Sequence, residues 1–127
     1  MTESEKFMGI LDTTALHNLR EKVGGDDEFV AELIHDFLND APRMLADIHR
    51  GLQNGDAVGL GRAAHSLKSN CAEFGATDLH DLCQALEEIG RTNVLDGAGE
   101  KIAQADAEYE KVKVALEKVC EQQFSGA

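Results

Sequence analysis

Apolar residues recur along this chain at spacings of three and four positions, and no segment alternates apolar and polar residues as a strand does. Because about 3.6 residues make one helical turn, this spacing predicts helices throughout the chain. The clearest stripe consists of Leu60, Ala64, Leu67, Cys71 and Phe74. The pattern therefore predicts an all-α protein.

Aspartates that can cap helix N-termini and glycines that can end helices divide the pattern into five segments. We expect a short first helix between Asp12 and Gly24, and a second, long helix that opens at Asp26 or Asp27. The apolar stripe of the second helix keeps its phase across Pro42. A kinked but continuous helix is therefore expected there.

The second helix should end at Asn54-Gly55, and Asp56 should open a third helix that ends at Phe74-Gly75. Thr77 is the expected cap of a fourth helix that closes near Gly90, and a last helix follows a turn-rich stretch. Short connections between amphipathic helices imply antiparallel neighbours. The predicted fold is an antiparallel up-down four-helix bundle with an additional short N-terminal helix.

The length of the chain predicts one domain over residues 1–127, with residues 1–8 and 122–127 as loose ends. Twenty-four acidic against twelve basic residues give a net charge of −12, which argues against nucleic acid and anionic membranes as partners. The three cysteines lack the paired spacing of a zinc site and are expected to be reduced thiols. With no signal segment or membrane-spanning run, we expect a cytoplasmic monomer.

His65 is the candidate for chemistry, because at about 100° per residue it faces away from the apolar stripe of the third helix. Small side chains leave its imidazole accessible, and two cations flank it. The residues within about 60° of His65 are Val58, Gly61, Arg62, Lys68, Ser69 and Ala72.

An ordinary imidazole is mostly unprotonated at pH 7 and is a nucleophile without a separate general base. The two cations would favour the neutral ring and attract a phosphoryl group. No glycine-rich phosphate loop, Walker lysine or kinase motif accompanies the histidine. The sequence thus indicates a phosphate carrier whose phosphoryl donor is another protein, without ATP-dependent kinase activity of its own.

These residues also form a pattern that resembles the histidine-containing phosphotransfer (HPt) domains of two-component phosphorelays. The resemblance runs from Ile10 to the last helix. Its most specific parts are His65-x-Leu67-Lys68, then Gly75-Ala76, Leu79, Cys83, Leu86 and Glu87 at the family's spacing, and Phe37-Leu38-Asn39-Asp40-Ala41-Pro42 in the second helix.

The resemblance implies that His65 is phosphorylated on Nε2 and that Lys68 stabilises the phosphate and its transition state. Glu87 would orient Nδ1 of His65, while Gln84 and Arg91 would border the docking surface. The family usually has glycine directly after the lysine, where this chain has Ser69. The serine hydroxyl could hydrogen-bond the phosphate or the partner, so the departure bears on partner preference.

The resemblance further implies that His65 accepts a phosphoryl group from the receiver domain of a hybrid histidine kinase and passes it to the aspartate of a response regulator. The chain itself would bind no cofactor, and Mg²⁺ is expected on the receiver. A helical adaptor without chemistry is the main alternative. A di-metal bundle is disfavoured, because Glu32-x-x-His35 is the only such unit where two are needed.

Apolar residues near the amino terminus leave two further interpretations open. Phe7, Met8, Ile10 and Leu11 form either a frayed end or a docking patch for a partner helix close to the active histidine.

Overall fold

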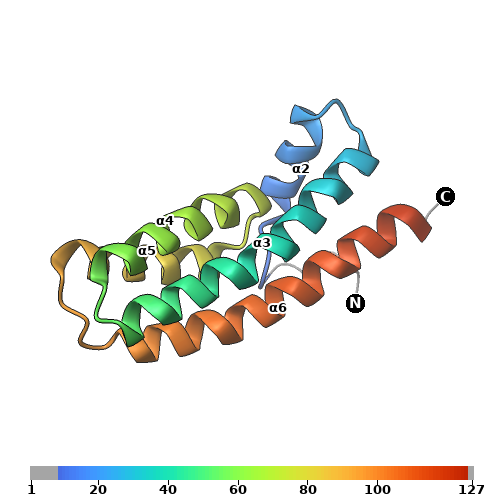
Figure 1. Cartoon of the computed structure of the whole chain (residues 1–127). Coiled ribbons are helices and arrows are strands. Elements are labelled where there is room, and N and C mark those ends of the chain that lie inside the picture. The colour runs from blue at the N-terminus through green and yellow to red at the C-terminus, as the bar shows by residue number, and fades with distance from the viewer. Residues whose placement is uncertain (1–8, 126–127) are drawn as a thin grey trace.

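The computed structural model describes residues 9–125, with side chains described through residue 121. The chain forms a bundle of long helices with one short helix packed at its end (Figure 1). The helices are α2 (Thr13–Lys22), α3 (Asp27–Gln53), α4 (Ala57–Phe74), α5 (Thr77–Thr92) and α6 (Ala98–Ser125).

The four long helices make a ring of neighbours in which α3 packs on α4, α4 on α5, α5 on α6 and α6 on α3. Successive helices run in opposite directions, and α2 packs against α4 and α3 (Figure 1). The predicted bundle with an extra N-terminal helix is confirmed. The long antiparallel contact between α4 and α5 carries the candidate site.

Aspartate side chains begin three of the helices, as the sequence predicted. Asp12 accepts from the Thr14 amide at 2.9 Å, Asp26 from Phe29 at 3.1 Å and Asp56 from Gly59 at 2.9 Å. Each bond satisfies a backbone N–H that has no partner within its helix. Helix α3 also continues across Pro42, as expected from the unbroken phase of its apolar stripe.

The expected boundaries of α5 were wrong at both ends. Ala76 is the N-cap and makes no side-chain cap bond, while the Thr77 hydroxyl donates to the Gly75 carbonyl at 3.2 Å. The helix also continues past Gly90 to Thr92, and Asn93 ends it in the left-handed conformation with φ 60°. Gly90 is therefore inside the helix, where it has a packing role described below.

The C-terminal end differs from the sequence prediction as well, because α6 remains helical through Ser125 where residues 122–127 were expected to be loose. Residues 1–8 and 126–127 lie outside the described part of the chain. The expectation that these segments are loose ends stays a prediction there.

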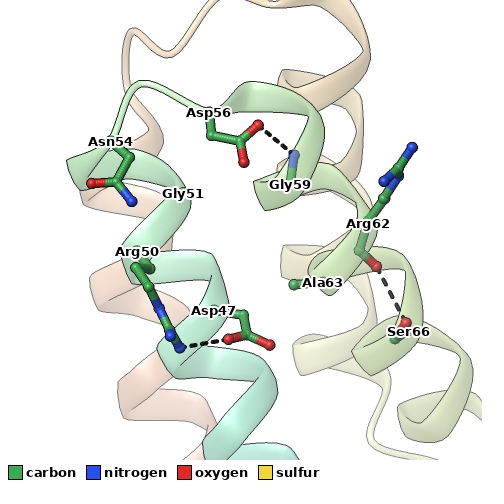
Figure 2. A pocket seen from close by; sticks show the side chains of 9 residues that line it. All are labelled: Asp47, Arg50, Gly51, Asn54, Asp56, Gly59, Arg62, Ala63 and Ser66. Carbon is green, nitrogen blue, oxygen red and sulfur yellow. Dashed lines mark hydrogen bonds and ion pairs between the residues drawn. The ribbon is translucent and has the colours of Figure 1, made fainter.

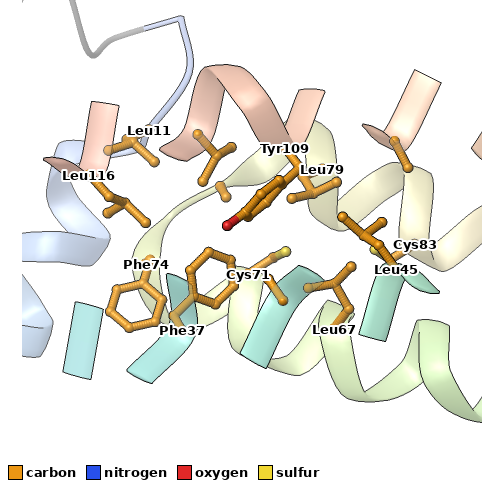
Figure 3. Packing of buried hydrophobic residues seen from close by; sticks show 14 of the residues in the cluster. Leu11, Phe37, Leu45, Leu67, Cys71, Phe74, Leu79, Cys83, Tyr109 and Leu116 are labelled. Atoms are coloured by element: carbon orange, nitrogen blue, oxygen red, sulfur yellow. The ribbon is translucent and has the colours of Figure 1, made fainter. Parts of the chain in front are cut away.

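The core lies between all four long helices (Figure 3). Phe37 of α3 contacts rings of two other helices, with centroids 5.1 Å from Phe74 of α4 and 6.3 Å from Tyr109 of α6. The stripe predicted for α4 is buried in full. Other apolar residues are only half-buried and pack against the edge of the core, among them Leu38, Leu52, Leu82, Ile89 and Val119.

The N-terminal apolar segment belongs to this core as far as it is described. Leu11 is buried, Ile10 packs against the cluster, and the Asp12 amide donates to the Gly75 carbonyl at 2.7 Å. Ile10 and Leu11 are thus neither a frayed end nor an exposed patch beside His65, while Phe7 and Met8 lie outside the described residues.

Candidate functional site

His65 projects from α4 into solvent, with 60% of its side chain exposed, on the side of the helix that faces α5. The buried stripe of α4 occupies the opposite side, as its spacing predicted. His65 lines an open groove of about 620 Å³ between the two helices, together with Val58, Gly61, Arg62, Ser66, Glu87, Gly90 and Arg91. The imidazole is therefore accessible to a partner protein.

A carboxylate on α5 holds one nitrogen of the ring. Nδ1 of His65 lies 2.5 Å from Oε2 of Glu87, and the other carboxylate oxygen accepts a hydrogen bond from Nζ of Lys68, also at 2.5 Å. Glu87 is thus shared between a histidine and a lysine that both come from α4. The predicted position of Glu87 beside Nδ1 agrees with this geometry.

The Lys68 ammonium is the main cause that holds the pKa of Glu87 below its usual value. Partial burial raises that pKa, and the contact with His65 adds a further lowering. An ionised carboxylate can only accept hydrogen bonds, so Nδ1 must be the donor. In the neutral ring, Nε2 then carries the lone pair, which makes it the nucleophilic nitrogen.

The side chain of Lys68 is largely covered, with only 19% of it exposed, although its position on α4 lies near the exposed His65. Nζ donates to Oε1 of Gln84 at 3.3 Å besides its bond to Glu87. Gln84, expected at the border of the docking surface, is therefore a partner of the lysine. The charge of Lys68 acts on the Glu87 carboxylate, which also contacts the imidazole.

Ser69 and Ala72 are both exposed on α4, which agrees with an accessible imidazole. The Ser69 hydroxyl donates to the backbone carbonyl of His65 at 3.2 Å. The hydroxyl proton is therefore used within the helix, and Ser69 offers a partner or a phosphate its small size rather than a free donor.

Two arginines flank the groove. Arg91 is 73% exposed and forms an ion pair with Glu88, one turn away on α5. Arg62 lies on the ridge between the His65 groove and a second groove of about 440 Å³ between α3 and α4, where its side chain extends away from Ser66 and the helix surface (Figure 2). On a protein with net charge −12, these cations border the histidine.

Gly61 was predicted to serve access to His65, but the structure shows that it also packs against α5. A Cβ on Gly61 would lie 3.2 Å from Cα of Gly90, which is tighter than ordinary contact. Gly90 itself was missed as a site residue because it was interpreted as a helix end. The sequence did contain a sign of this contact, because Gly61 and Gly90 each lie within the apolar pattern of one of two successive helices.

The other candidates for chemistry in this chain are metal-binding side chains and the three cysteines. Among residues 9–121, no group of three or more His, Cys, Asp or Glu side chains is arranged to hold a metal ion. Cys71, Cys83 and Cys120 are free and buried. Contact with Cys83 and burial raise the pKa of the Cys71 thiol, which disfavours its reactive thiolate.

Within the described residues, no helix is both long and apolar enough to cross a membrane.

Comparison with known proteins identifies the family. The Hpt domain model matches residues 32–121, which include His65, Lys68 and Glu87. The chain therefore belongs to the Hpt domain family, a class of histidine-containing phosphotransfer proteins.

Individual relatives agree with this assignment. The crystal structure of histidine-containing phosphotransfer protein B (HptB) from Pseudomonas aeruginosa PAO1 superposes with a TM-score of 0.82 at 30% identity, covering 88% of this chain and 95% of that one. Histidine-containing phosphotransfer protein 2 of Arabidopsis thaliana is 27% identical over 86% of this chain and 72% of its own length. Multistep phosphorelay regulator 1 of Schizosaccharomyces pombe is 25% identical over 69% of this chain and 30% of its own length.

Proposed function

We propose that this protein is a phosphorelay intermediate that carries a phosphoryl group on Nε2 of His65. The observation that carries the proposal is the exposed imidazole whose Nδ1 is held by the Glu87 carboxylate. That contact selects the tautomer with a lone pair on Nε2 and fixes the ring. The relatives named for histidine-containing phosphotransfer support the same chemistry.

The proposed donor is the phosphorylated aspartate of a receiver domain, belonging to a hybrid histidine kinase. Nε2 of His65 forms a bond to phosphorus while the bond between phosphorus and the aspartyl oxygen breaks, and the aspartate leaves as a carboxylate. Nδ1 keeps its proton, so the phosphorylated ring becomes an imidazolium whose positive charge faces Glu87. The reverse sequence delivers the phosphoryl group to the aspartate of a response regulator.

The receiver would also supply Mg²⁺, which neutralises charge on the phosphoryl group during transfer. Arg62 and Arg91 would meet the acidic side chains that such a metal-binding pocket requires. One copy of the chain contains the whole cluster of His65, Lys68 and Glu87, so we propose that the protein works as a monomer. Its free cysteines favour the cytoplasm.

The test is the transfer of label from a phosphorylated receiver. Incubation with the ³²P-labelled receiver domain of a hybrid kinase should move label onto this protein, in a linkage that is stable to alkali and labile to acid, as a phosphoramidate is. Incubation with labelled ATP alone should give no label. Binding of the receiver without any transfer would favour the alternative of an adaptor without chemistry, and label from ATP alone would contradict the proposed route.

Steric access should limit transfer, because the receiver must bring its aspartate against Nε2. Ser69 is exposed one turn from His65, so Ser69→Leu should block docking while leaving the buried stripe of α4 untouched. We expect about a tenfold or greater loss of transfer rate, from the misplacement of the reacting atoms. The measurement is a transfer time course beside a thermal melt.

Ser69→Gly is the matched variant, because it restores the residue more common in the family and adds no bulk. It should keep transfer and extend the range of receivers accepted. Normal transfer by a folded Ser69→Leu protein would show that receivers do not dock over this part of α4.

A further inference from the structure

The backbones of α4 and α5 touch at one point, where Gly61 faces Gly90. A Cβ on Gly90 would lie 2.6 Å from Cα of Gly61, 2.7 Å from the Ala57 carbonyl oxygen and 2.9 Å from the Gly61 nitrogen, whereas ordinary contact begins at 3.4 Å. All three atoms belong to the backbone of α4 and cannot rotate aside. Both glycines lie inside helices, where glycine is less favourable than alanine, so this close approach accounts for their presence.

This contact between the glycines lies one helical turn from the hydrogen bond between His65 and Glu87. Because α4 and α5 are antiparallel (Figure 1), one turn forward from Gly61 leads to His65, while about one turn back from Gly90 leads to Glu87. These two side chains meet at 2.5 Å. The glycine contact therefore sets the spacing of the helices where the carboxylate must reach the ring.

We propose that Gly90 is a positioning residue for phosphotransfer, because its contact with Gly61 holds the Glu87 carboxylate on Nδ1 of His65. The inference rests on the proposed role of His65 and adds a buried residue that acts on His65 through Glu87. A side chain at position 90 forces α4 and α5 apart by several tenths of an ångström. A short hydrogen bond between rigid helices cannot absorb that separation without weakening.

Gly90→Ala tests the proposal with two measurements. The ¹⁵N NMR signals of the His65 imidazole should show a loss of the fixed Nδ1–H tautomer in the unphosphorylated protein, since the hydrogen bond to Glu87 is weakened. The transfer rate from a phosphorylated receiver should fall about tenfold, because a displacement of about 1 Å can cost 100-fold and this one is smaller.

Gly99→Ala is the matched control. Gly99 lies in the first turn of α6, and its Cβ would meet only Cδ2 of Leu52 at 3.8 Å, an ordinary contact. This variant should leave both the imidazole signals and the transfer rate unchanged.

A double-mutant cycle separates positioning from a general loss of packing. If Gly90 acts through Glu87, Gly90→Ala should slow transfer in the wild-type protein but have little further effect in a Glu87→Ala background. An equal loss in both backgrounds, or unchanged imidazole signals in Gly90→Ala, would overturn the proposal.

Gly61→Ala is a second variant that tests the same contact between the glycines. Should Gly90→Ala fail to fold, Gly61→Ala carries the same cycle with a milder clash, because its Cβ meets Cα of Gly90 at 3.2 Å. If the wild-type protein accepts no phosphoryl group from any receiver, the proposed function fails, whereas the NMR comparison still decides whether the glycine contact positions Glu87 on His65.

Discussion

His65→Gln should abolish phosphorylation of the protein by a labelled receiver and leave its melting temperature nearly unchanged. Glutamine has a side chain of comparable size but no nucleophilic ring nitrogen, so the phosphoryl group has no acceptor. The side chain is 60% exposed and an exposed pair is worth little, so the substitution should change the free energy of unfolding by about 1 kcal/mol or less. Label retention and thermal melts, measured on the same preparations, check both statements.

His49→Gln is the matched control for this substitution. His49 is 46% exposed on α3 and its Nε2 contacts Asp106 of α6 at 2.7 Å, so it too is a surface histidine beside a carboxylate. This variant should be labelled as fast as the wild type. Undiminished label on His65→Gln would falsify the choice of His65 and direct attention to the remaining histidines.

The sequence predicted the bundle well because its evidence is local. Helix periodicity and aspartate caps depend on neighbouring residues, so the α4 stripe and the cap at Asp56 were found without knowledge of the fold. The outward position of His65 followed from the same arithmetic. Where a local signal was ambiguous the prediction failed: a threonine after Gly75-Ala76 favoured Thr77 as a cap, although the chain turns through Gly75 at φ 73° and the helix is capped at Ala76.

The arrangement of the site could not be predicted in full, because it depends on the distance between two helices. Helical spacing places Lys68 near His65, but the choice of Glu87 and Gln84 as its partners depends on the register of α5 against α4. Gly90 shows the same limit, since a glycine inside an apolar pattern is compatible with either a helix end or a close crossing. Only the packed structure distinguishes the two.

Lys68→Ala should slow phosphotransfer by about 10- to 1000-fold, the range for removing one preorganised electrostatic group. Receiver affinity should change much less, because Lys68 is only 19% exposed and offers the partner little surface. Removing the ammonium also removes the main cause that lowers the pKa of Glu87, so that pKa should rise toward its usual value. Stopped-flow transfer rates and receiver titrations separate the two effects.

The pH dependence gives this prediction a second, independent readout. A depressed pKa keeps the wild-type Glu87 ionised as the pH falls, so its carboxylate continues to accept from Nδ1 of His65. In Lys68→Ala the carboxylate should protonate at a higher pH than in the wild type, which a ¹³C NMR titration of the Glu87 carboxyl measures directly. Lys111→Ala is the charge control, because Lys111 is exposed and pairs with Glu108 on α6, away from the site. Equal transfer rates and equal Glu87 titration curves for the wild type and Lys68→Ala would show that the contact between Lys68 and Glu87 contributes nothing to transfer.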